Sequence, residues 1–216
     1  MKKLIVAAVT AVLLAPALSF AAVLDFGTGT AGGGGTIVDV GGGDALGINI
    51  FLDNLTAIGT SADNVYNLDG ALPCVTGSGG LCAALNFDTA AGTFSIVGSV
   101  PALGVGQTTL VTGTIDTFTF TATGLFASFN AFGTDIKDPA LLTALGIPTD
   151  TPFSFAGFSL GFASPIACGE GQTCYTAIST DFADVSSSAP IPEPATLILL
   201  GGGLLGLARA RKRNAA

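Results

Sequence analysis

Few residues of this sequence carry the side chains that acid–base or nucleophilic catalysis needs. The chain contains no histidine, which removes Ser-His-Asp and Cys-His catalysis and most transition-metal sites. Lys137 is the only basic residue in residues 23–189, so any Schiff-base or Ser-Lys chemistry there would depend on it. Because Lys137 lies between Asp135 and Asp138, we predict instead a charge pair at the protein surface.

A cluster of oxygen-bearing side chains is the candidate for metal binding. The segment SADNVYNLDG contains Asp63, Asn64, Asn67 and Asp69, which carry the hard donor atoms that Ca²⁺ prefers. The spacing matches no EF-hand loop, and the same residue types form turns in which side chains bond the neighbouring backbone. We favour the turn and keep calcium as the weaker candidate. No other cofactor is predicted.

Aspartate is abundant enough to allow a hydrolase that uses two carboxylates. Residues 23–189 nevertheless contain a single glutamate, Glu170, and the chain has no tryptophan to form a platform for a sugar ring. We therefore predict a protein that is not an enzyme. The alternative is a carbohydrate-binding or adhesive module that contacts sugar through Tyr66, Tyr175 or aspartates at a sheet edge. A secreted hydrolase is the weakest of the three.

Three glycines have the spacing of a dinucleotide-binding fingerprint, but the helix that such a site requires is not predicted. Gly27, Gly29 and Gly32 match GxGxxG, but such a site requires a helix that begins inside the motif. The GGGTIVDVGGG that follows cannot form a stable helix. We expect a flexible or turn-rich segment here instead.

The charge of the central segment excludes one class of partner. Residues 23–189 contain fourteen acidic residues against one basic residue. A surface this acidic repels phosphate backbones. We therefore expect no binding of nucleic acid.

The four cysteines form two close pairs, Cys74 with Cys82 and Cys168 with Cys174. An even number of cysteines in an exported chain predicts disulfides. Three connectivities are open, and we favour the two local pairs because short glycine-rich loops close readily and each bridge would tie the tip of a hairpin. A four-cysteine zinc site would need CxxC-like spacing, which is absent.

The elements that must position these residues are predicted to be strands separated by turns. The segment DTFTFTATG alternates Phe118 and Phe120 with threonines, which is the period of a half-buried strand. Further candidates are LFASFNAFG, GTFSIVGSV and GINIFLDNLTAIG. In PFSFAGFSLGFAS the apolar positions change phase, which predicts a β-bulge at Gly157.

One short helix interrupts the strands. In DPALLTALGIP, Asp138 can cap the N-terminus, Pro139 suits the first helical position, and Gly146 suits the residue after the end. These signals predict a helix over residues 139–145. Because long helices do not alternate with the strands, we predict an all-β fold, an antiparallel β-sandwich of the jelly-roll-like or Ig-like kind with one short helix.

Both ends of the chain have the composition of processing segments. Lys2 and Lys3 precede an apolar run at residues 4–14 and then small residues, which predicts a signal helix over residues 1–21 that signal peptidase removes. Residues 195–208 are uncharged, and a helix of that length spans about 21 Å, less than the ~30 Å of a hydrocarbon core. The basic residues that follow would stay on the cytoplasmic side; they are Arg209, Arg211, Lys212 and Arg213.

The order of features near the C-terminus resembles a known sorting signal. Pro192, Glu193 and Pro194 precede the apolar run, and the basic cluster follows it. This segment resembles the PEP-CTERM signal of exported bacterial proteins, although Ile191 stands where that family commonly has valine. Similar tails are also catalogued as an ice-binding protein C-terminal domain. Ice binding would want a repeated Thr-x-Thr array, of which TFTFTAT is the one extended example here.

The resemblance implies recognition by an exosortase, a membrane protease, with cleavage near residues 192–194. It also implies a host that makes extracellular polysaccharide. We therefore expect an exported surface or extracellular-matrix protein, associated with exopolysaccharide or biofilm and transiently anchored by a transmembrane helix at residues 195–208; an ordinary single-pass anchor is the alternative. The expected organisation is a signal peptide at 1–21, a β-sandwich domain at 22–185, a linker at 186–191 and the sorting signal at 192–213.

Overall fold

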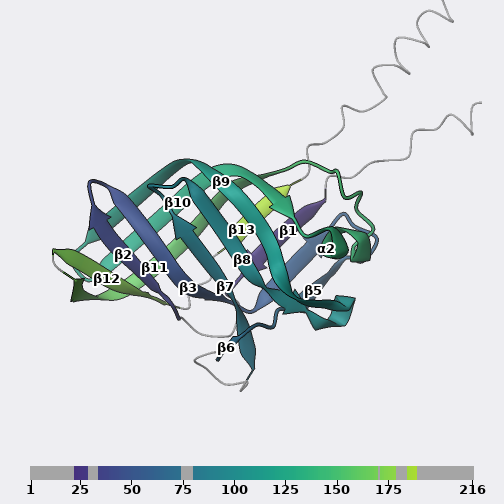
Figure 1. The fold of residues 1–216 in the computed structure, drawn as a ribbon, viewed down its shortest axis with the longest axis horizontal. Coiled ribbons are helices and arrows are strands. Elements are labelled where there is room, and N and C mark those ends of the chain that lie inside the picture. The colour runs from purple at the N-terminus through teal and green to yellow at the C-terminus, as the bar shows by residue number, and fades with distance from the viewer. Residues whose placement is uncertain (1–21, 29–33, 74–79, 170, 179–183, 189–216) are drawn as a thin grey trace, which may run out of the picture. The chain divides into compact units, whose positions relative to one another are not determined.

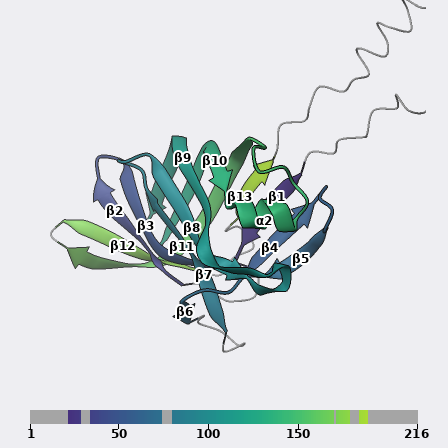
Figure 2. The same ribbon diagram turned by 45° about the vertical axis from the view of Figure 1, so that its right-hand side comes forward.

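The computed structural model describes residues 22–28, 34–73, 80–169, 171–178 and 184–188, which belong to one compact unit, Ala22–Pro190 (Figures 1 and 2). Strands make up most of this unit. They are β1 (Val23–Gly27), β2 (Thr36–Gly41), β3 (Asp44–Leu52), β4 (Asn54–Ile58), β5 (Asn64–Asn67), β6 (Leu72–Pro73), β7 (Leu81–Asp88), β8 (Thr93–Val100), β9 (Val105–Thr123), β10 (Phe126–Lys137), β11 (Phe153–Gly169), β12 (Gln172–Ala177) and β13 (Asp184–Ser188). A 3-10 helix η1 (Pro101–Leu103) and an α-helix α2 (Pro139–Ala144) complete the described elements.

The strand pairings form one continuous path that returns on itself. The order is β10-β9-β8-β7-β3-β2-β12-β11, and β10 also pairs with β11, so these eight strands form a closed circuit. The path continues from β11 through β13, β1 and β4 to β5. The pairings between the described strands are antiparallel, which confirms the predicted antiparallel all-β class.

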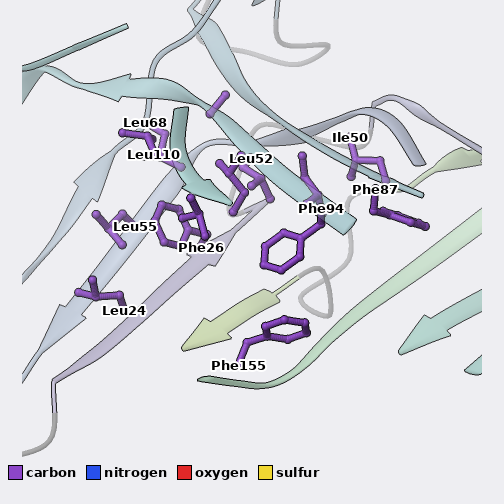
Figure 3. Packing of buried hydrophobic residues seen from close by; sticks show 14 of the residues in the cluster. Leu24, Phe26, Ile50, Leu52, Leu55, Leu68, Phe87, Phe94, Leu110 and Phe155 are labelled. Atoms are coloured by element: carbon purple, nitrogen blue, oxygen red, sulfur yellow. The ribbon is translucent and has the colours of Figure 1, made fainter. Parts of the chain in front are cut away.

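The core fills the space enclosed by these strands. Phe87 of β7 stacks on Phe129 of β10 with ring centroids 4.4 Å apart, and these two strands are not neighbours in the circuit. Phe94 of β8 meets Phe155 of β11 edge to face at 4.9 Å, and Figure 3 shows these two rings next to each other. Aromatic contacts across the interior therefore join opposite strands, in geometries that aromatic rings prefer.

Alternating side chains explain why these segments are strands. In β9, Phe118 and Phe120 pack against the core, while Thr117, Thr119 and Thr121 are exposed, as predicted. Successive side chains of a strand point to opposite faces, so a period of two buries one set and leaves the other set in water. The half-buried strand predicted from DTFTFTATG is confirmed.

The predicted β-bulge in β11 is also confirmed. Ala131 of β10 pairs with Phe158, but Gly133 pairs with Phe155, so β11 has one extra residue in this stretch. The pairing of β11 with β13 also shifts register between Ser154 and Gly157. A bulge of this kind reverses the inward phase of the side chains that follow it.

The glycine-rich N-terminal segment contains more regular structure than expected. Leu24 and Phe26 of β1 have no exposed surface, and β1 pairs with β4 and β13. The expectation of a flexible or turn-rich segment is wrong for β1 and β2, because burial of apolar side chains outweighs the conformational cost of the nearby glycines. Residues 29–33, which hold Gly29 and Gly32 of the GxGxxG spacing, lie outside the described residues.

The last described strand extends into the range expected to be a linker. In β13, Ser186, Ser187 and Ser188 pair with Asp25, Leu24 and Val23 of β1. Three of the residues assigned to the linker at 186–191 are therefore part of the sheet. Serine is not among the residue types enriched in strands, so the pairing partner rather than the local sequence places these residues in the sheet.

Helix α2 is confirmed with its predicted signals. Asp138 caps it by accepting hydrogen bonds from the backbone N–H groups of Ala140 at 2.8 Å and Leu141 at 3.0 Å. Pro139 occupies the first turn, and Gly146 follows the end with φ of 71°. Leu141 and Leu142 are buried, so the helix contributes to the core beside β9.

Candidate functional site

Two charged side chains point into the core at the end of β10. Asp135 and Lys137 are two residues apart in the strand, so their side chains lie on the same face as those of Ala127, Phe129 and Ala131, which are buried. Lys137 Nζ donates a hydrogen bond to Asp135 Oδ1 at 2.7 Å, and both side chains have 0% exposure. The inward face of β10 thus changes from apolar side chains to a buried ion pair.

Aromatic rings surround the buried ammonium group. Lys137 Nζ lies 4.6 Å from the ring centroid of Phe153 and 6.0 Å from that of Phe26. Burial lowers the pKa of Lys137, an effect that the nearby Asp135 carboxylate partly opposes. Within the described part of the chain, Asp135 Oδ2 has no hydrogen-bond partner. The environment therefore disfavours charge on the amine.

A cavity of about 410 Å³ adjoins this pair. Its walls come from the end of β10, from α2 and from the segment that leads into β11; the lining residues are Thr134, Asp135, Ile136, Lys137, Leu142, Thr149, Asp150, Thr151, Pro152 and Phe153. Asp150 supplies a second carboxyl group to the lining. The ion pair is therefore buried next to a space that small molecules such as water can occupy.

The expectation of a surface charge pair at Lys137 is wrong. Lys137 pairs with Asp135 in the interior, and Asp138 is used to cap α2. The signal that would have found this is the parity of β10, because residues 127, 129, 131, 135 and 137 are all odd-numbered and share one face. Adjacent opposite charges in a short polar stretch instead suggested exposure.

The four calcium-candidate residues lie in and beside β5. Asp63 Oδ1 accepts hydrogen bonds from the backbone N–H of Thr60 at 2.6 Å and from its hydroxyl at 3.0 Å. Asn64 Oδ1 accepts from Val65 N–H at 2.8 Å, and Asp69 Oδ1 accepts from Gly70 N–H at 2.8 Å. These are the local bonds expected of turn-forming side chains. The bonds from the backbone N–H groups of Thr60 and Gly59 lower the pKa of Asp63.

Three of these four residues line a larger cavity of about 780 Å³. Asn64, Asn67 and Asp69 share this lining with Asp53 and with apolar residues that include Val65 and Leu81. Asp63 is not part of it, so the four residues do not converge on one point. Among the residues that the structure describes, no three His, Cys, Asp or Glu side chains gather closely enough to hold a metal ion. Calcium binding stays a prediction.

Neither tyrosine offers a ring to a sugar. Tyr66 is 8% exposed, and its hydroxyl donates to the carbonyl of Ala62 at 2.5 Å. Tyr175 is 6% exposed and meets Phe120 edge to face. The expectation that Tyr66 or Tyr175 contacts sugar is wrong, because the strand positions of both residues turn their rings into the core.

One of the two predicted disulfides is confirmed. Cys168 and Cys174 are bonded, with Cα atoms 5.7 Å apart, and they join β11 to β12 at the tip of their hairpin. Cys82 in β7 is also disulfide-bonded, while its expected partner Cys74 lies outside the described residues. The described cysteines therefore include none with a free thiol, in agreement with an oxidising destination.

The sequence did not single out the outward side of β9 and β10. Along residues 117–123 of β9 and 126–132 of β10, the side chains that point outward carry no charge, and we call this surface the β9–β10 outer face. It consists of Thr117, Thr119, Thr121, Thr123, Phe126, Ser128, Asn130 and Phe132. Phe126 is 59% exposed and Phe132 is 49% exposed. The alternation in DTFTFTATG predicted an outward face only for the threonines of β9, and only the strand register shows that hydroxyl and amide groups of β9 and β10 stand side by side.

The two terminal segments fall outside the described residues. The predicted signal helix at 1–21, the triplet Pro192, Glu193 and Pro194, and the basic cluster from Arg209 to Arg213 are all in undescribed ranges. Within the described ranges, no helix combines the length and apolar character needed to cross a membrane.

Comparison with known protein families identifies a match at the C-terminal end of the sequence. Residues 190–213 match the family model of the PEP-CTERM protein-sorting motif. The chain carries a PEP-CTERM motif. Neither the curated proteins nor the solved structures contain a match to the chain.

The PEP-CTERM motif indicates the destination of the protein. It marks an exported protein that an exosortase sorts to the cell surface, so an exosortase is an interaction partner. The matched segment includes the proline–glutamate–proline triplet and ends at Arg213, the last residue of the basic cluster. The resemblance expected from these residues is confirmed, whereas the match does not extend into the β domain.

Proposed function

We propose that this chain is a non-enzymatic surface or extracellular-matrix protein that associates with exopolysaccharide or biofilm. In this proposal signal peptidase removes residues 1–21, and the helix at 195–208 holds the chain in the membrane until the exosortase cleaves near residues 192–194. The β domain, a sandwich of the jelly-roll-like or Ig-like kind, is then released or attached at the surface. The match of residues 190–213 to the PEP-CTERM motif is the observation that carries this proposal.

The intact mass of the mature protein purified from its host tests the sorting step. We expect a species that lacks both residues 1–21 and the tail beyond Pro194. A variant with Pro192, Glu193 and Pro194 replaced by alanine is the control and should keep the tail, because the protease would lose its recognition segment. Wild-type protein that still carries residues 209–213 would contradict the proposal and indicate a permanent anchor.

The β9–β10 outer face supports a second candidate function, a carbohydrate-binding module. Its hydroxyl and amide groups can donate to and accept from sugar hydroxyls, and the exposed rings of Phe126 and Phe132 can pack on the apolar faces of sugar rings. No charged side chain belongs to this face, although the domain as a whole is strongly acidic. A neutral glycan fits such a surface better than a charged partner does.

Retention of the mature protein on the host's own polysaccharide tests this candidate. Thr119→Lys with Thr121→Lys should abolish retention, since two long charged side chains would cover the face. Thr176→Lys is the matched control, because Thr176 is exposed on β12, outside the outer face, and it should leave retention unchanged. Equal retention of all three proteins would rule out this face as the binding surface.

The proposal that the protein is not an enzyme has its own test. Asp53 and Asp69 line the same cavity, and two carboxylates around one cleft are what a glycosidase would need. We expect the chain length of the polysaccharide to stay constant on incubation with the mature protein. Shortening that disappears in Asp69→Asn would instead favour the hydrolase.

A further inference from the structure

We propose that Lys137 and Asp135 become joined by an amide bond between Lys137 Nζ and Asp135 Cγ, an intramolecular isopeptide cross-link within β10. This inference concerns the β domain and does not depend on the proposed function. It rests on the contact, the burial and the cavity at the end of β10.

The reacting groups already touch. Nζ lies 2.7 Å from Oδ1, so the nitrogen is within van der Waals distance of the carboxyl carbon that it would attack. Both side chains extend from the same face of one strand, which fixes their separation and orientation. Fixed geometry of this kind gives effective molarities of about 10⁵–10⁸ M in favourable intramolecular reactions.

Burial favours the uncharged form of the Lys137 amine. Neither side chain has exposed surface, and the rings of Phe153 and Phe26 lie beside the nitrogen. Figure 3 shows that Phe26 itself lies among Leu52 and Leu55. Proton transfer from Nζ to the carboxylate removes two buried charges and produces the amine and the carboxylic acid that condensation requires.

The reaction balances without another reagent. The Nζ–Cγ bond forms, the Cγ–Oδ2 bond breaks, and Oδ2 leaves as water with two of the three ammonium protons. The third proton remains on the amide nitrogen, and Oδ1 becomes the amide carbonyl. No electron is transferred, so neither an oxidant nor a reductant is needed.

The adjoining cavity gives the leaving water a place to go. Asp135 and Lys137 both line this space of about 410 Å³, and Asp150 lines it as well. A second carboxyl group in the lining can relay protons through cavity water. Among described residues, Oδ2 has no hydrogen bond to break, so its departure costs no existing interaction of the protein.

The amide bond would stabilise the fold by removing buried charges rather than by constraining the unfolded chain. A ring that closes between residues 135 and 137 removes little entropy from the unfolded chain. Replacing two buried ions by one neutral amide, however, removes the desolvation penalty of both ions. The amide bond would also explain why a lysine is buried at a position where it contributes no charge to the surface.

Trypsin digestion and intact mass of the purified full-length or mature protein test the cross-link. Lys137 is the only tryptic site in residues 23–189, and trypsin does not cleave after an acylated lysine. After reduction and denaturation, we expect the wild-type domain to remain uncut and to be lighter than its sequence by the mass of one water. Lys137→Arg is the matched control, since a guanidinium does not condense, and it should be fully cleaved and have its full sequence mass.

A second variant separates chemistry from protease access. Asp135→Ala keeps Lys137 but removes the acyl group, so its domain should be cleaved after Lys137 in denaturant even if it folds poorly. Wild-type protein of full mass that trypsin divides into two fragments at residue 137 would overturn the proposal.

Discussion

Lys137 Nζ and Asp135 Oδ1 are 2.7 Å apart, and neither side chain has surface exposed to bulk solvent. Each group therefore depends on the other for its stability in the fold. Removal of one member of a buried pair leaves an uncompensated charge and costs about 3–5 kcal/mol, whereas replacement of both by apolar side chains is often neutral or stabilising.

Because of this dependence, we predict that replacing Asp135 restores stability that is lost when Lys137 is replaced. Lys137→Met alone should lower the free energy of unfolding strongly, because the Asp135 carboxylate stays buried without a cation. The addition of Asp135→Leu should raise it again by about 3 kcal/mol, since the charge is then gone. Urea unfolding of the two variants measures the difference. A double variant no more stable than Lys137→Met would show that Asp135 carries no uncompensated charge.

Asp63 predicts a pH dependence outside the core. The backbone N–H groups of Thr60 and Gly59 donate to its carboxylate and lower its pKa below the usual 3.8. Because the folded-state pKa is the lower one, these bonds stabilise the turn above pH 3.8, and that contribution is lost as the pH falls through the folded-state value. We expect an NMR titration of the Asp63 carboxyl carbon to have its midpoint below 3.8 in the folded protein and closer to 3.8 in urea. Equal midpoints would contradict the assigned bonds.

At the scale of elements, α2 depends on its cap. Asp138 accepts from two backbone N–H groups at the helix start, and a helix of six residues has little stability of its own. Asp138→Ala should therefore lower the free energy of unfolding by about 0.5–2 kcal/mol. Asp138→Asn is the control, because asparagine retains the accepting oxygen and should lose less. Thermal unfolding of the two variants measures the effect, and equal losses would indicate that charge rather than capping matters.

The sequence predicts the strands well where one face is apolar and the other polar. Phe118 and Phe120 against the threonines of β9 form such a pattern, and the change of phase around Gly157 correctly indicated the bulge. Prediction failed where partners far away in the chain decide the outcome. Ser186–Ser188 become a strand because β1 pairs with them, and Lys137 lies in the interior because β1 and β11 bring Phe26 and Phe153 close to its amine.

The candidate site was less predictable than the fold for the same reason. Tyr66 and Tyr175 have side chains suited to sugar contact, but strand register decides which face they occupy. The β9–β10 outer face likewise combines side chains of two strands, and their alignment follows from the pairing of Thr121 with Ser128 and of Thr119 with Asn130. Residue type alone contains no information on either alignment.

At the scale of the whole domain, the core depends on contacts that cross the circuit. Phe129 has no exposed surface and stacks on Phe87 across the interior. Phe129→Ala should lower the free energy of unfolding by about 3–5 kcal/mol, because it removes a buried ring and leaves a cavity. Phe132→Ala, on the outward side of the same strand, is the matched control and should change it by about 0.5 kcal/mol or less. Similar losses in both variants, measured by urea unfolding, would argue against the inward phase of β10.

The pairing of β1 with β13 determines when an exported chain can complete its sheet. Val23 and Ser188 are partners, so the first strand of the domain cannot complete its ladder until almost the entire domain has crossed the membrane. Such long-range pairing is slow to form, and the half-finished sheet exposes an open edge in transit. Because the sorting motif begins at residue 190, directly after that last strand in the sequence, the sheet can be completed only when the sorting motif is about to emerge.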